Sequence, residues 1–240
     1  MTQRHGVRGS AWLMVLLTGI AGWVDAVAYV RSGEVFVANQ TGNAVFLAVQ
    51  VAERRLPGVS RIHVAVGGDT YGPLASLIGF CLGVALAVIP LRRARRAGAD
   101  DGAPPWHLLA MEAALLGTVV LLAGTPREIR LGLAAAAMGV QSVYAARVAM
   151  RGVTTTTLTG TLVALISTFA EDPGRRARKA IFLLSAVWAA YTLGAWGGAA
   201  AGLRWSIGTV HGVAALVAVA AAVAVWREQR TSDPPPMLRP

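Results

Sequence analysis

The sequence is poor in charge and nearly free of cysteine. Charged residues make up 14% of the 240 residues, against about 25% in soluble domains, which leaves little polar surface to face water. The single cysteine, Cys81, excludes an intramolecular disulfide framework. The sequence also lacks a Walker A motif, a G-x-S-x-G elbow and a metal-ligand spacing among its four histidines. We therefore expect no enzymatic activity, no cofactor and no metal.

Acidic residues are scarcer than basic ones, since 12 Asp and Glu stand against 22 Lys and Arg, a formal net charge of +10. A nucleic-acid-binding protein would gather its basic residues on one folded surface. Here they lie in short connections between apolar runs, a pattern typical of cytoplasmic loops that contact anionic lipid headgroups. We expect the partner of these residues to be the lipid bilayer and not a nucleic acid.

Long apolar runs are what the chain does contain, and 55% of its residues are hydrophobic. A helix of about 20 apolar residues crosses the hydrocarbon core of a bilayer. Six runs are about that long: 11–30, 73–91, 106–124, 129–149, 180–202 and 207–226. The predicted fold class is all-α, a polytopic helix bundle in a bacterial cytoplasmic membrane.

Two further segments, 35–52 and 153–170, are apolar but interrupted by glycine and polar residues. At an offset of 118 residues they align without gaps, and the stretch that begins at each is identical at seven of nineteen positions. A run with G-x-x-x-G spacing follows each segment, and then a run opened by tryptophan. We predict two membrane repeats flanked by two cytoplasmic tails, the second tail disordered. Their bounds are 1–10 (N-terminal tail), 11–124 and 125–227 (repeats), and 228–240 (C-terminal tail).

The number of crossings decides how the two halves are related. If both interrupted segments span, eight spans make parallel repeats. If these segments only re-enter the membrane, each half has three spans and the halves are inverted. The two densest basic clusters, 92–96 and 175–179, both fall on the cytoplasmic side with six spans but not with eight. We favour six spanning helices plus two broken or re-entrant segments, in inverted halves.

Polar residues at membrane depth concentrate in the interrupted segments. Non-helical backbone is tolerated there only against protein or a wet cavity, and breaks at corresponding positions of two halves point to a transporter binding site. The alternative is that the amides and hydroxyls join helices. The candidate pathway residues, including one from the run 129–149, are Asn39, Thr41, Gly42, Asn43, Thr157, Thr159, Gly160 and Gln141.

Asp25 is the one acid deep in the first apolar run. A lipid-facing aspartate costs about 2.5–3.5 kcal/mol on insertion scales, so we expect Asp25 to face the bundle interior. It is a candidate proton or cation site on the same pathway. A structural hydrogen bond to a neighbouring helix is the alternative.

Glu112 and His211 hold matching positions, each six residues after the tryptophan that opens the last run of its half. They could form a proton relay, or be solvated near the membrane interface. Close helix packing is the expected role of the G-x-x-x-G residues, which are Gly79, Gly83, Gly194, Gly198 and Gly202.

Several motifs resemble those of the YoaK-like family of bacterial inner-membrane proteins. They are GWVDA at 22–26, Gly33, VFVAN at 35–39 with TGN at 41–43, GVQS at 139–142 and TGT at 159–161. The resemblance covers roughly 11–226 and implies a cytoplasmic-membrane protein with about six spans. Gln40 and Ser142 depart from the hydrophobe and asparagine expected there, which weakens a ligand role at position 142. Because the family is defined by a domain of unknown function, the resemblance implies no substrate.

These patterns predict a small secondary transporter or channel for an unidentified small solute or ion, with a central polar site formed by the two broken segments. The second hypothesis is a non-transporting membrane module, a sensor or assembly partner, whose G-x-x-x-G faces associate into a homo-oligomer. A third and weaker one is an intramembrane enzyme that uses Asp25 with Glu112 or His211, since no recognisable nucleophile or metal set accompanies them.

Overall fold

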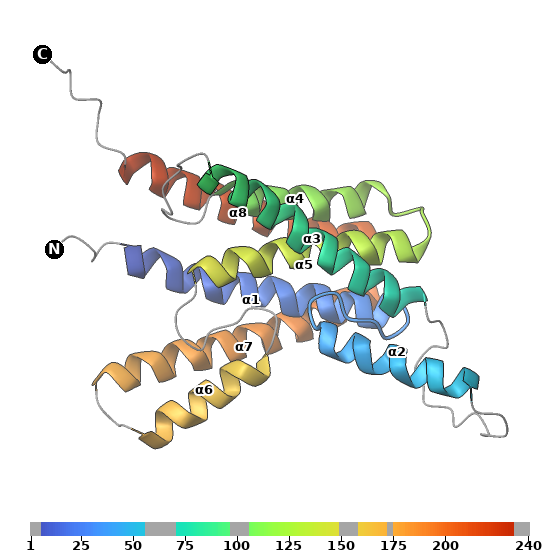
Figure 1. Cartoon of the computed structure of the whole chain (residues 1–240), viewed down its shortest axis with the longest axis horizontal. Coiled ribbons are helices and arrows are strands. Elements are labelled where there is room, and N and C mark those ends of the chain that lie inside the picture. The colour runs from blue at the N-terminus through green and yellow to red at the C-terminus, as the bar shows by residue number, and fades with distance from the viewer. Residues whose placement is uncertain (1–5, 56–70, 97–105, 149–157, 172–174, 233–240) are drawn as a thin grey trace, which may run out of the picture.

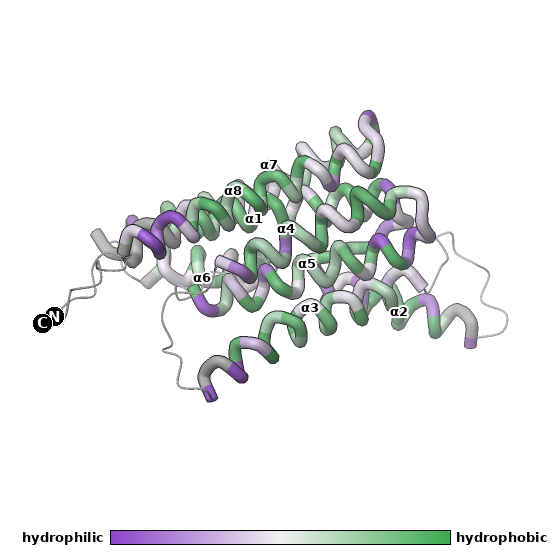
Figure 2. The backbone as a smooth tube through the Cα atoms, turned by 90° about the horizontal axis from the view of Figure 1, so that it is seen from above, coloured by the Kyte–Doolittle hydropathy of each residue, from purple (hydrophilic) through white to green (hydrophobic). Residues whose placement is uncertain are grey.

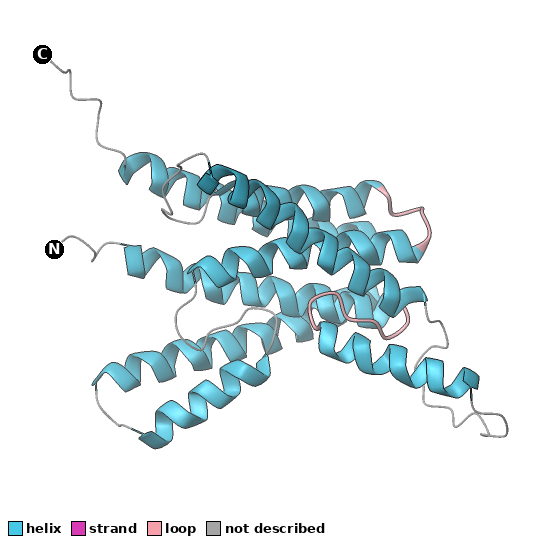
Figure 3. Ribbon diagram, in the orientation of Figure 1, coloured by secondary structure: helices cyan, strands magenta, loops and turns pink. Residues whose placement is uncertain are grey.

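The computed structural model describes residues 6–55, 71–96, 106–148, 158–171 and 175–232, and all regular structure within them is α-helical (Figure 3). The helices are α1 (Gly6–Arg31), α2 (Gln40–Arg55), α3 (Tyr71–Arg96), α4 (Trp106–Leu121), α5 (Arg127–Val148), α6 (Leu158–Glu171), α7 (Arg175–Arg204) and α8 (Ile207–Ser232). The all-α prediction is confirmed.

Five helices, α1, α3, α5, α7 and α8, are long and apolar enough to cross a membrane. α4 covers the remaining predicted run, 106–124, but has 16 residues, or about 24 Å of helix. This is somewhat less than the hydrocarbon core of about 30 Å. Figure 2 shows hydrophobic residues along the middle of the helices and hydrophilic ones toward their ends. The chain is a multi-pass membrane protein.

The long helices pack in pairs, α1 along α7, α3 along α5 and α4 along α8, while α2 lies against α3 and α6 against α7 (Figure 1). Followed from the blue to the red end of the chain, α1, α4 and α7 run one way along the bundle, and α3, α5 and α8 run the other way. The pairs α1–α7 and α3–α5 are therefore parallel, and α4–α8 is antiparallel.

Glycines bring the two parallel pairs into close contact. A Cβ added at Gly79 or Gly83 on α3 would collide with the backbone of α5. A Cβ added at Gly194 or Gly198 on α7 would collide with the backbone of α1, whereas one at Gly202 would meet ordinary van der Waals contacts. Small residues at this spacing allow helix backbones to approach in membranes, and four of the five glycines singled out in the sequence lie at such contacts.

α1 begins and α8 ends at the same end of the bundle, where α3 also ends and α7 begins (Figure 1). The basic clusters 92–96 and 175–179 are the last and first turns of these helices. They therefore extend helices instead of occupying the connections, because Arg and Lys are good helix formers.

The predicted tails are also shorter than expected. α1 begins at Gly6, within the predicted N-terminal tail, and α8 continues to Ser232, so residues 228–232 are helical and not disordered. Arg230 lies over the Trp226 ring, 4.2 Å from its centroid, which stabilises this last turn.

Candidate functional site

α1 ends in a left-handed turn. The amide of Glu34 donates to the carbonyl of Tyr29 at 3.0 Å, and Gly33 and Glu34 have φ of 79° and 62°. Glycine adopts this conformation without steric cost, which is why it commonly follows a helix end. The turn reverses the chain, so that the following loop runs back beside α1 (Figure 3).

The returning segment, residues 35–39, is non-helical yet mostly buried. Val35, Val37 and Ala38 are at most 2% exposed, and the Phe36 ring stacks between the rings of Tyr29 and Phe46 at centroid distances of 5.4 and 5.9 Å. α2 then begins at Gln40. Irregular backbone of this kind needs internal hydrogen-bond partners, because no lipid atom can supply them.

Asp25, on α1, accepts hydrogen bonds from two of these backbone amides. Its Oδ1 accepts hydrogen bonds from the amides of Val37 and Ala38 at 2.7 and 2.6 Å. Its Oδ2 accepts one from the Tyr191 hydroxyl on α7 at 2.5 Å. We call the non-helical segment 35–39 the break. Asp25 lies six residues before the end of α1, so the break lies about 9 Å inside that end of the bundle. The carboxylate is 2% exposed.

Asn43, in the first turn of α2, holds the neighbouring part of the segment. Its Oδ1 accepts from the Phe36 amide at 3.0 Å, and its Nδ2 donates to the Phe36 carbonyl at 2.6 Å. Ser76 on α3 donates to that same carbonyl at 2.7 Å. Gln40 completes the group through its Nε2, which donates to the Val37 carbonyl at 2.8 Å.

We call the side chains of Asp25, Asn43, Ser76, Gln40 and Tyr191 the break cluster. Charge-assisted hydrogen bonds are short and about twice as strong as neutral ones, which fits the three contacts of Asp25. Three donors to one carboxylate favour its ionised form even in a buried place. The cluster therefore fixes the backbone of the break and joins α1, α3 and α7 around it.

The other first-half candidates lie beside this cluster with different exposures. Asn39 is half-buried and directly precedes α2, and Thr41 is exposed. A Cβ at Gly42 would press into the Phe36 ring, so glycine lets that ring pack over the helix start. Of the predicted pathway residues, Asp25 and Asn43 are the two that bind the break directly.

The second broken segment is not brought to the break cluster in the residues that the structure describes. Thr159 and Gly160 are exposed at the start of α6, which packs against α7, whereas α2 packs against α3. A Cβ at Gly160 would meet open space. Thr157 lies outside the described residues.

Gln141 joins α5 to α1. Its Nε2 donates to the Leu17 carbonyl at 3.0 Å, while its buried Oε1 lacks a hydrogen-bond partner among the described residues. This contact is where the two parallel helix pairs meet, away from the break itself.

Glu112 and His211 are both buried but are not brought together. His211 Nδ1 is 2.9 Å from the Ile207 carbonyl, and the adjacent Gly212 faces Val120, near the end of α4. Glu112 lies in the second turn of α4, near its start. Because α4 and α8 are antiparallel, the two side chains occupy opposite ends of their interface, which argues against a direct relay between them.

Sequence reasoning missed Ser76 and Tyr191 and treated Gln40 only as a departure from a family pattern. Ser76 and Tyr191 both lie within apolar runs, and Tyr191 is 166 residues from its partner Asp25. Nothing local distinguishes them from helix-packing residues, so the tertiary structure was needed to find them.

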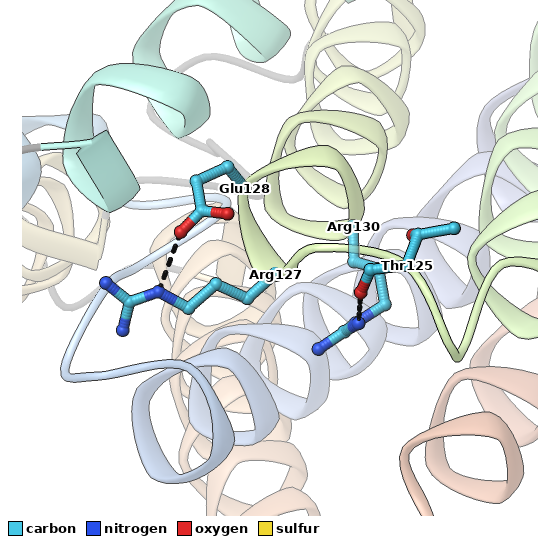
Figure 4. Close-up of polar contacts among 4 residues, drawn as sticks. All are labelled: Thr125, Arg127, Glu128 and Arg130. Atoms are coloured by element: carbon cyan, nitrogen blue, oxygen red, sulfur yellow. Dashed lines mark hydrogen bonds and ion pairs between the residues drawn. The ribbon is translucent and has the colours of Figure 1, made fainter.

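The α4–α5 turn lies at the end of the bundle opposite the start of α1 and the end of α8 (Figure 1). It carries a second polar group (Figure 4). Arg127 Nε donates to Glu128 Oε1 at 2.9 Å, and Arg130 donates to the carbonyls of Ala123 and Thr125. A Cβ at Gly33 would touch the Arg127 guanidinium, so this group also packs on the turn after α1. Among the described residues no three His, Cys, Asp or Glu side chains are placed to hold a metal ion.

Comparison with known proteins fits this architecture. Residues 13–225 match the family model described as protein of unknown function (DUF1275). The chain belongs to that family. It is also similar to the UPF0700 transmembrane protein YoaK of Bacillus subtilis (strain 168), with 31% identity over 179 residues, which are 73% of this chain and 74% of that protein. The YoaK-like resemblance is confirmed. No solved structure matches.

Proposed function

We propose that this DUF1275 protein is a small secondary transporter or channel whose two halves are inverted around the break before α2. The observation that carries the proposal is the buried non-helical segment 35–39, held by Asp25 from α1 and by Tyr191 from α7. Discontinuous helices near the middle of the membrane form the binding sites of many transporters. The solute is a small molecule or ion.

The helix arrangement supports inverted halves. Exchanging α1 with α5, α2 with α6, α3 with α7 and α4 with α8 turns the pair α1–α7 into α3–α5, and α2–α3 into α6–α7. Each exchanged helix runs opposite to its counterpart (Figure 1). This is the relation produced by a two-fold axis in the membrane plane.

Close contacts repeat under the same exchange. A Cβ at Gly22 on α1 would collide with the backbone of Tyr191 and approach that of Ala195, four residues on. A Cβ at Gly139 on α5 would do the same at Phe80 and Val84, again four residues apart on α3. The proposal therefore has six crossings, α4 included, with α2 and α6 re-entrant and both basic clusters cytoplasmic.

The break cluster gives the proposal a mechanism. It connects the α1–α7 pair, through Asp25 and Tyr191, to the α3–α5 pair, through Ser76. An ion or solute that competes for the Asp25 carboxylate or the amides of residues 37 and 38 would loosen the connection between the pairs. Binding would thereby be coupled to their relative movement, which is what alternating access requires.

The test is flux into vesicles reconstituted with the purified protein, using panels of labelled small solutes and ions. Asp25→Asn and Asn43→Ala should abolish the flux, while Val45→Ala, on the exposed face of α2, should retain it. Full flux in both cluster variants would exclude the site. Reporter fusions after residues 60 and 98 test the topology: six crossings place 60 outside and 98 inside, and the reverse supports eight.

One observation favours the alternative of a non-transporting membrane module. The break cluster is already paired internally, since the Asn43 amide alone makes hydrogen bonds to Phe36, Gln40 and Ser76. In that case the polar residues are purely structural, and the close-packing glycines serve assembly, including self-association. Both versions involve no enzymatic step, no cofactor and no nucleic acid, and their basic helix ends contact anionic headgroups.

A further inference from the structure

Glu112 is a second buried acid, in surroundings unlike those of Asp25. Its side chain is 0% exposed, and neither carboxyl oxygen has a hydrogen-bond partner among the described residues. Glu112 shares the buried face of α4 with Leu108, Leu109 and Leu116. α4 packs against α5 and α8. A carboxylate without donors in such a place is strongly disfavoured, whereas the neutral acid is tolerated.

Tyr144 on α5 links Glu112 to a second acid, Glu228 on α8, and both helices pack against α4. The Tyr144 hydroxyl on α5 is buried and interacts electrostatically with Glu112 and also with Glu228 on α8. Glu228 is exposed, in the last turns of α8, at the bundle end that carries the basic clusters. Tyr144 is therefore close enough to interact with a buried acid and with one that water reaches.

We infer that Glu112 is a proton-binding site, which holds a neutral carboxylic acid inside the α4–α5–α8 interface and exchanges its proton toward Glu228 past Tyr144. Glu228 collects protons at the membrane surface, and the Tyr144 hydroxyl relays them. If the proposed transport function holds, Glu112 makes the proton the coupling ion, and this last clause alone rests on that function. In this proposal Asp25, which accepts three hydrogen bonds, anchors the break, and Glu112 carries the proton.

Infrared spectroscopy of the full-length protein in lipid tests the site without a substrate. At neutral pH the spectrum should contain the carbonyl band of a protonated carboxylic acid. Glu112→Gln should remove this band, and Asp25→Asn should leave it. In D₂O the band should shift as the proton exchanges, at least several-fold more slowly in Tyr144→Phe and Glu228→Gln. If the acid were purely structural, its proton would exchange at the wild-type rate in both variants, and that result would overturn the route.

Carbodiimide labelling tests the same site in the wild-type protein, so this experiment does not depend on whether a variant folds. A protonated carboxyl adds across a C=N bond of dicyclohexylcarbodiimide, its proton moves to the nitrogen, and the adduct rearranges to a stable N-acylurea. Mass spectrometry should place the label on Glu112 and not on Asp25, with labelling lost at high pH. Label on Asp25, or on neither acid, would overturn the proposal. A labelled Glu112 in a protein that carries no solute flux would leave the proton site standing and remove transport.

Discussion

Two acids among the described residues are enclosed in the bundle, and their surroundings are opposite. Asp25 is 2% exposed and accepts three hydrogen bonds, from two backbone amides and a tyrosine hydroxyl. Glu112 is 0% exposed, and no described residue donates a hydrogen bond to it. Burial alone therefore does not assign a role to an intramembrane acid. The donors around it decide whether it anchors backbone as an anion or holds a proton as a neutral acid.

The largest expected difference is in stability. Asp25→Asn removes the charge that binds the amides of residues 37 and 38, and should lower the free energy of unfolding by about 3 kcal/mol. The matched variant Glu112→Gln loses no hydrogen bond in the described structure and should change it by less than about 1 kcal/mol. Detergent titration in bicelles measures both. If both variants lost the same free energy of unfolding, the two acids would not differ in their structural role.

Asn43→Ala should have the next largest effect. It leaves the partly buried amide of Phe36 without its acceptor, and the Phe36 carbonyl keeps only the Ser76 hydroxyl as a side-chain donor. The expected cost is about 2 kcal/mol. Thr41→Ala, two residues earlier and exposed, is the control and should stay within about 0.5 kcal/mol. The same titration applies, and a loss for Thr41→Ala as large as for Asn43→Ala would show that the whole start of α2 is sensitive, not the cluster.

Tyr191→Phe should have a smaller effect, since it removes one donor and leaves two on Asp25. Side-chain hydrogen bonds between membrane helices contribute about 0.6 kcal/mol on average and up to about 1.7, so a loss of about 1 kcal/mol is expected. Tyr29→Phe, at a tyrosine that is 40% exposed, provides the control. An unchanged Tyr191→Phe protein would mean that the two amides alone hold the carboxylate.

The membrane class and most of the helices could be predicted from the sequence because they follow from apolar length. A break in this segment was also predictable, but we expected it at the polar residues 39–43. The structure places it earlier, at 35–39, and α2 already begins at Gln40. The role of Asp25 was not, because its partners Val37, Ala38 and Tyr191 come from a reversed loop and a distant helix. The matching of Glu112 with His211 was misleading as a relay, since antiparallel packing places matched positions at opposite ends.

Thiol labelling at Thr41 tests most directly whether the break before α2 borders a water-filled path. Cys81 is exposed on α3 within the apolar run, and it serves as a lipid-facing control in the same molecule. In Thr41→Cys protein in sealed vesicles, a membrane-impermeant maleimide should modify position 41 and leave Cys81 unmodified, while a lipid-soluble maleimide modifies both. If position 41 reacts only with the lipid-soluble reagent, the break is a dry structural element and the transporter proposal is contradicted.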